Sequence, residues 1–130
     1  MPPSKSAAAA RRADIHAHVL PREIPDFKAR FGYGGFIRLL HQKDGKALMA
    51  RDDGKPFREV GPELFDDEAR LRRCDETGVA VQVVSTVPVM FSYWAKPKDG
   101  LAVAQYLNDD VARLVRARPG RFVGLGTLPL

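Results

Sequence analysis

Apolar residues along the chain form three strand-like runs. Residues 79–87 are almost continuously apolar and β-branched, which is typical of a strand buried on both faces of a parallel sheet. Residues 122–128 have the same character up to Pro129, and a run over residues 13–20 ends at Pro21. The pattern therefore predicts three strands of one parallel sheet.

Two helical patterns lie between these strands. The first covers residues 66–77, where Asp66 or Asp67 can cap the helix and Gly78 can end it. Its inward face would carry Leu71 and Cys74. The second helix covers residues 99–118 and ends at Pro119–Gly120; its apolar stripe is made by Ala104, Leu107, Val111, Leu114 and Val115. Strands that alternate with helices predict an α/β fold.

Residues 31–60 interrupt this alternation. Asp44–Gly45 and Asp53–Gly54 predict two tight turns between strands at residues 36–41, 47–51 and 56–60. We therefore expect a small β-meander inserted after the first strand.

Three strands and two helices are only part of a larger architecture. A (β/α)8 TIM barrel needs about 250 residues, and this chain stops directly after a strand. We expect residues 13–130 to be the N-terminal part of such a barrel, with residues 1–12 as a disordered leader. An isolated piece would leave apolar faces and a sheet edge in water, so we expect it to associate.

The composition and charge of the chain exclude some classes of protein. The 130 residues are 45% hydrophobic and carry a net charge of +5. Three of the 21 basic residues (Lys5, Arg11 and Arg12) lie in the leader, so the remainder carries 18 basic and 16 acidic groups. This balance predicts no nucleic-acid binding, and no apolar run is long enough for a membrane helix. The lone Cys74 fits a buried apolar position in a reducing, cytoplasmic protein.

A pair of histidines carries the strongest chemical signal. His16 and His18 lie two residues apart in the first predicted strand, so both point to one face, about 6.5–7 Å apart along the strand. Two imidazoles so placed can tilt toward one zinc ion, with bonds of about 2.0–2.1 Å. Ile15, Ala17 and Val19 would face the other way, under the helices. The alternative is one hydrogen-bonded core histidine beside a half-exposed one.

Four blocks of sequence add a resemblance. They cover residues 14–21, 30–35, 85–97 and 121–129, and the third, rich in aromatic residues and proline, is the most specific. In these blocks the chain resembles the N-terminal part of the aminocarboxymuconate semialdehyde decarboxylase family of the amidohydrolase superfamily. The resemblance implies a zinc-containing barrel that removes a carboxylate without oxidation in the kynurenine pathway of tryptophan catabolism.

The resemblance also implies site residues. His16 and His18 would be two zinc ligands, Arg58 would bind a substrate carboxylate with Phe57 beside it, and Trp94 would line or support the mouth of the site. The other zinc ligands and the catalytic histidine belong to later segments in the family. We therefore expect no catalytic residue within this chain and no turnover by the chain alone.

Several alternatives stay open at this point. The chain could be a truncated, non-catalytic product, or a related barrel that decarboxylates or hydrolyses another substrate. Arg58 could be a solvated strand-end charge and Trp94 a packed loop aromatic. We predict a small carboxylate as the binding partner and a homodimer of the full-length protein. His41, next to a polar turn, is expected to be a hydrogen-bonded surface residue and not a ligand.

Overall fold

The computed structural model describes residues 11–130, so residues 1–10 of the predicted leader lie outside the described residues. Arg12, which was predicted to belong to the leader, is instead the first residue of the first strand. The helices are α1 (Phe27–Phe31), α2 (Asp67–Thr77) and α3 (Pro97–Ala117), with single 3-10 turns at Pro62–Leu64 and Pro88–Phe91. The strands are β1 (Arg12–Val19), β2 (Ile37–His41), β3 (Ala47–Arg51), β4 (Pro56–Val60), β5 (Val79–Thr86) and β6 (Phe122–Gly124). The mixed α/β class predicted from the sequence is confirmed.

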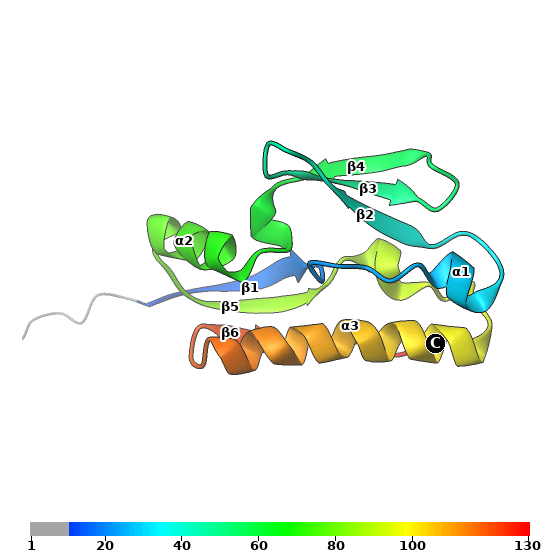
Figure 1. The fold of residues 1–130 in the computed structure, drawn as a ribbon. Helices are drawn as coiled ribbons and strands as arrows, with labels where there is room; N and C mark the ends of the chain where they lie inside the picture. The colour runs from blue at the N-terminus through cyan, green and yellow to red at the C-terminus, as the bar shows by residue number, and fades with distance from the viewer. Residues whose placement is uncertain (1–10) are drawn as a thin grey trace, which may run out of the picture.

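The strands form two separate sheets (Figure 1). β1, β5 and β6 make a parallel sheet in the order β1-β5-β6, with α2 connecting the first pair and α3 the second. β2, β3 and β4 make the predicted antiparallel meander, which lies on the opposite side of β1 and β5 from α3. Both predicted turns are present, with Gly45 at φ 85° and Gly54 at φ 88°, where glycine avoids steric strain.

The two long helices begin and end for local reasons. Asp66 accepts a hydrogen bond from the Ala69 N–H at the start of α2, and Gly78 ends it at φ 71°. α3 begins at Pro97, two residues before the predicted start, because proline suits the first turn of a helix. The predicted apolar stripe of α3 and the inward position of Cys74 are confirmed.

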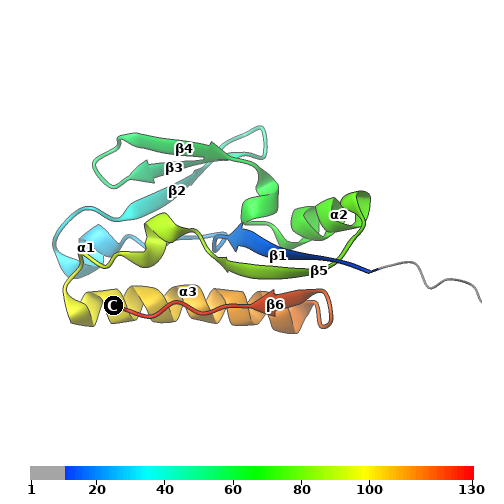
Figure 2. The same ribbon diagram turned by 180° about the vertical axis from the view of Figure 1, so that it is seen from behind.

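Three further details differ from the sequence prediction. The last strand is predicted over residues 122–128 but β6 ends at Gly124. Beyond it, the backbone N–H and C=O of Thr127 bond to the side-chain amide of Asn108 on α3, so the chain leaves the sheet and runs back along the helix (Figure 2). The five-residue α1, capped by Asp26, has too short a periodic pattern to be predicted.

The third difference concerns Ile15. The sequence places it under the helices, but its side chain is 79% exposed. Between Asp14 and Ala17, β1 advances three residues while β5 advances only two, from Gln82 to Val84. This bulge breaks the alternation of faces, so Ile15 turns outward while Ala17 and Val19 pack as predicted.

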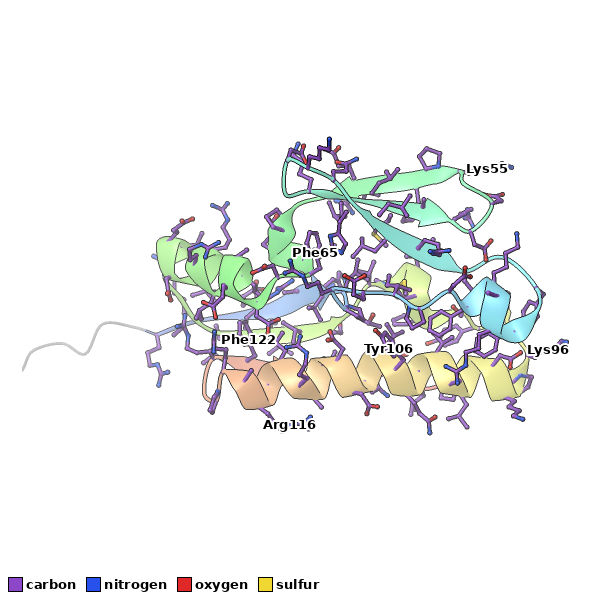
Figure 3. All side chains as sticks on the ribbon, viewed as in Figure 1. Lys55, Phe65, Lys96, Tyr106, Arg116 and Phe122 are labelled. Carbon is purple, nitrogen blue, oxygen red and sulfur yellow. The ribbon has the colours of Figure 1, made fainter. Side chains whose placement is uncertain are left out.

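Two apolar clusters hold the sheets and helices together. The larger lies between the meander and the first half of α3, and Figure 3 shows Phe65 and Tyr106 in this region. Its fully buried members include Leu20, Phe27, Met49, Val103 and Leu107. The smaller lies between the parallel sheet and the helices and contains Val19, Cys74, Val84, Val111, Leu114 and Phe122. Together they fix the position of β1, which carries the histidine pair.

Candidate metal site and the adjacent cleft

The two histidine side chains converge. The Nε2 atoms of His16 and His18 lie 3.2 Å apart, with ring centroids 5.0 Å apart and ring planes nearly perpendicular. His16 is exposed and His18 is half-buried. Both rings therefore lie on one side of β1, as the two-residue spacing predicts, with their Nε2 atoms directed toward each other.

This separation can be compared with a metal site. Two nitrogen ligands on one tetrahedral zinc ion, each with a bond of about 2.0–2.1 Å, lie about 3.3–3.4 Å apart. The observed 3.2 Å agrees, and imidazole nitrogen is a preferred donor for zinc. Within residues 11–130, however, no third histidine, cysteine or carboxylate joins the pair in a metal-binding cluster. The described residues thus fit a metal ion but provide only two of the three or four protein ligands that zinc sites use.

A polar network built around the buried Arg70 fixes the backbone of the pair. Arg70 on α2 is only 6% exposed, and its guanidinium donates to the His18 carbonyl oxygen and to Gln82 Oε1. Gln82 Nε2 donates to Asp14 Oδ2 at 2.9 Å, and Asp14 Oδ1 accepts the His16 backbone N–H at 3.1 Å. One chain of hydrogen bonds therefore joins the peptide groups of both histidines.

The surroundings of Asp14 and Arg70 also shift the pKa of each side chain. The hydrogen bonds from Gln82 and from the His16 N–H lower the pKa of Asp14, so its carboxylate form is favoured. Burial lowers the pKa of Arg70, and within residues 11–130 no carboxylate lies within ion-pair distance of it. The His18 carbonyl and Gln82 are thus the direct partners that satisfy this buried guanidinium.

A second contact reaches the ring of His18. Ser85 on β5, the register partner of His18, places its Oγ 3.2 Å from His18 Nδ1. Sequence reasoning assigned no role to Ser85, Gln82 or Arg70. A signal for Arg70 was present, because it lies four residues before the buried Cys74 and so shares its inward face of α2.

The predicted carboxylate-binding residues lie beside the histidines. A cleft of about 340 Å³ is lined by His18, Phe57, Arg58, Glu63, Leu64 and Val87, among others. Arg58 lies on β4 opposite Met49 and forms no ion pair with any described residue. Phe57 is 46% exposed at the same cleft. The structure therefore brings His18, Arg58 and Phe57 to one site.

Trp94 lies elsewhere. It does not line this cleft, but packs on Phe36, at 4.8 Å between ring centroids, and on Tyr33. A Cβ on Gly35 would lie 2.7 Å from the Trp94 ring, so glycine permits this close contact. Trp94 is nevertheless 54% exposed, and its role at the mouth of the site stays a prediction. The Nε2–H of His41 donates a hydrogen bond to the Arg22 carbonyl oxygen at 2.6 Å, as expected of a hydrogen-bonded surface histidine.

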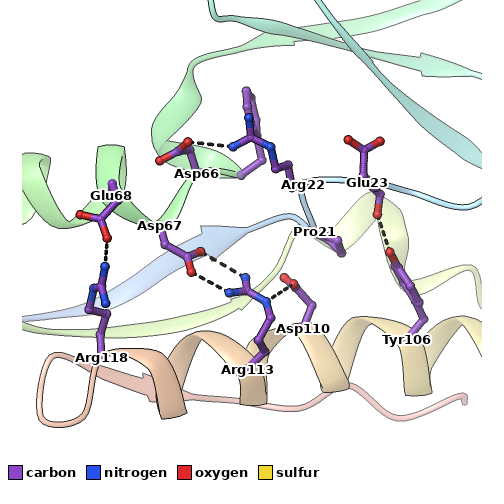
Figure 4. A pocket seen from close by; sticks show the side chains of 11 residues that line it. Pro21, Arg22, Glu23, Asp66, Asp67, Glu68, Tyr106, Asp110, Arg113 and Arg118 are labelled. Carbon is purple, nitrogen blue, oxygen red and sulfur yellow. Dashed lines mark hydrogen bonds and ion pairs between the residues drawn. The ribbon is translucent and has the colours of Figure 1, made fainter.

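A second hollow, of about 450 Å³, lies between α2 and α3 (Figure 4). Its arginines are all paired: Arg113 with Asp67 and Asp110, Arg118 with Glu68, and Arg22 with Asp66. Because each arginine already contacts a carboxylate, the hollow offers no free cation to a ligand. Its ion pairs link α2, α3 and the segment after β1.

Comparison with known proteins gives consistent matches. The chain is 53% identical over 120 residues to a 2-amino-3-carboxymuconate-6-semialdehyde decarboxylase of Caenorhabditis elegans. It is 48% identical over 119 residues to a protein of the same name from Dictyostelium discoideum. Each match covers 92% of this chain but only 30% and 33% of the relatives, so the chain spans about a third of their length. The chain is homologous to these decarboxylases over the matched residues, and the predicted resemblance is confirmed.

Two further results complete the comparison. The crystal structure of Metarhizium anisopliae IDCase in apo form matches 93% of this chain and 35% of its own, with a TM-score of 0.67 and 16% identity. This likeness shows a shared fold. No protein-family model matches the chain. Within residues 11–130, no helix has the length and apolar character needed to cross a membrane.

Proposed function

We propose that this chain supplies part of the active site of a zinc-dependent, non-oxidative decarboxylase that acts on 2-amino-3-carboxymuconate 6-semialdehyde. The observation that carries the proposal is the convergence of His16 and His18 Nε2 atoms, 3.2 Å apart, next to a cleft that contains Arg58. The similarity to decarboxylases over 92% of the chain supports the choice of reaction and substrate.

The parallel sheet is proposed to be the first part of a (β/α)8 barrel. The order β1-β5-β6 with α2 and α3 as crossovers has the form of three consecutive barrel units, with the meander inserted after the first. In such barrels the active site lies at the carboxyl ends of the strands. His16 and His18 at the end of β1, and Ser85 at the end of β5, have this placement.

The roles of the residues follow from their chemistry. His16 and His18 would hold the zinc ion through Nε2, and further ligands would come from a polypeptide segment beyond residues 11–130. A zinc ion held there supplies a Lewis acid that lowers the pKa of water and stabilises developing negative charge. Arg58 binds a substrate carboxylate through its planar guanidinium, and Phe57 shields that contact from water. The substrate is thereby oriented while carbon dioxide is lost.

The first experiment measures metal binding. Zn²⁺ is titrated into the chain and into His16→Ala, with His41→Ala as the control because His41 lies outside the pair. We expect His16→Ala to lose binding and His41→Ala to retain it. Equal binding by His16→Ala and the unaltered chain would refute the metal site.

The second experiment measures activity in a complete protein. The matched 120 residues of the C. elegans relative are replaced by this chain, and decarboxylation is assayed. Arg58→Ala should lower kcat/KM by about 10–100-fold without loss of zinc, since a charge-assisted hydrogen bond contributes about 1.5–3 kcal/mol. Arg51→Ala, an exposed arginine of the neighbouring strand, is the control and should have little effect. A folded, zinc-loaded chimera without decarboxylase activity would contradict the proposed function.

A further inference from the structure

The contact between Ser85 and His18 has a chemical consequence for the proposed metal site. A neutral imidazole carries one proton, so a ring that binds a metal through Nε2 must hold its proton on Nδ1. Ser85 Oγ lies 3.2 Å from His18 Nδ1, on the side of the ring away from His16. A serine oxygen can accept the Nδ1–H hydrogen bond at that distance.

We propose that Ser85 is a positioning residue that holds His18 in the Nδ1–H tautomer, with its Nε2 lone pair directed at the metal position. The proposal rests on the proposed function, because it takes the point between the two Nε2 atoms to be the metal position. Partners of this kind, which bind the second nitrogen of a metal-ligating histidine, orient the ring and raise metal affinity.

The surroundings isolate the role of Ser85. The His18 peptide group is already fixed by the buried Arg70, and its register against β5 is fixed by the parallel sheet. These contacts leave the rotation of the imidazole ring and its tautomer to be set by other groups. Ser85 is the described residue that contacts Nδ1. Because Ser85 is the cross-strand neighbour of His18, it needs no movement of the backbone to make this contact.

The contact between His16 and His18 in the absence of metal also agrees with the Nδ1–H tautomer of His18. With the His18 proton on Nδ1, His18 Nε2 is an acceptor, and His16 Nε2–H can donate to it across 3.2 Å. No described residue hydrogen-bonds His16 Nδ1. His18 is therefore preset for metal, whereas His16 must exchange its tautomer when a metal binds.

Nuclear magnetic resonance tests this without any enzymatic assay. Imidazole ¹H–¹⁵N correlation spectra of the metal-free chain, recorded at a pH where the histidines are neutral, report which ring nitrogen of His18 is protonated. We expect the Nδ1–H form in the unaltered chain and in Ser85→Thr, and a shift toward the Nε2–H form in Ser85→Ala. The same spectra during a Zn²⁺ titration give the affinity, which should fall about 10–100-fold in Ser85→Ala and recover in Ser85→Thr.

Thr86→Val provides the matched control. Thr86 is the next residue on β5, and its buried Oγ1 has no hydrogen-bond partner among the described residues. Loss of that hydroxyl should change neither the His18 tautomer nor the Zn²⁺ affinity. A general weakening of β5 would instead lower the affinity of both variants.

The outcomes separate the two proposals. An Nε2–H tautomer of His18 in the unaltered chain, or an unchanged tautomer and Zn²⁺ affinity in Ser85→Ala, would overturn the role of Ser85. If neither His16 nor His18 in the unaltered chain responds to Zn²⁺, the proposed metal site fails, while the metal-free tautomer still decides whether Ser85 orients the ring.

Discussion

Replacement of Arg70 by methionine tests whether the hydrogen-bond network around this buried side chain supports the fold as well as the histidine pair. The guanidinium donates to two acceptors, the His18 carbonyl and Gln82 Oε1, and the residue is only 6% exposed. Methionine preserves much of the side-chain volume but leaves both acceptors without their donor. The change therefore isolates the hydrogen bonds from the packing.

The expected loss in the free energy of unfolding follows from these two hydrogen bonds. Each hydrogen bond from a charged donor contributes about 1.5–3 kcal/mol, so two give about 3–6 kcal/mol. The lower end applies, because the variant also removes a charge whose burial is unfavourable without a carboxylate partner. We expect the free energy of unfolding to fall by about 3 kcal/mol. With a urea dependence of about 1.5 kcal/mol/M, the unfolding midpoint falls by about 2 M.

Urea unfolding followed by circular dichroism measures this difference. Arg72→Met is the control, since Arg72 lies exposed on the same helix and its loss should change the free energy by less than about 0.5 kcal/mol. Gln82→Leu should cost less in the Arg70→Met background than alone, because the two residues share a hydrogen bond. Equal midpoints for Arg70→Met and Arg72→Met would refute the reasoning.

Two further predictions concern α2 and β6. Asp66→Ala removes the cap of α2 and should cost about 1 kcal/mol near pH 7. The Ala69 N–H, together with Arg22, lowers the pKa of Asp66 below 3.8. The loss of stability in Asp66→Ala should therefore be fully present above about pH 4 and shrink as the pH falls through the lowered pKa. Unfolding measured as a function of pH in the acid range tests this. Gly124→Ala places a Cβ 2.6 Å from Val111 Cγ1 and should cost about 1–3 kcal/mol in thermal unfolding. Gly126→Ala, whose nearest contact is 3.4 Å, is its control, and equal losses in the two variants would contradict the close packing of β6 on α3.

Local patterns predicted most of the elements. The helix spanning residues 67–77 has both its cap and its terminating glycine in the sequence, and the two Asp-Gly turns define the meander. The sequence prediction was wrong where contacts with residues distant in the chain change the path of the backbone. Asn108 binds Thr127 and shortens β6, and the bulge in β1 turns Ile15 outward.

The candidate site was predicted only in part. The spacing of His16 and His18 indicated a shared metal, and the resemblance supplied Arg58 and Phe57, which the fold places beside His18. The spacing could not identify Ser85, Gln82 or Arg70 as their supports, because these residues come from β5 and α2. The same limit applies to Trp94, whose packing on Gly35 depends on a loop contact distant in sequence.

The sequence by itself indicated that His16 and His18 could share a metal, since residue type, spacing and strand periodicity are local properties, and the resemblance added Arg58 as a carboxylate-binding residue. Only the tertiary structure decided how they meet. The two Nε2 atoms lie 3.2 Å apart while Arg70 of α2 holds the His18 peptide group and Ser85 of β5 contacts the His18 ring, and the cleft joins His18 of β1 to Arg58 of the meander. Both arise from contacts between segments far apart in the chain, where packing and hydrogen bonding, and not local preference, set the geometry.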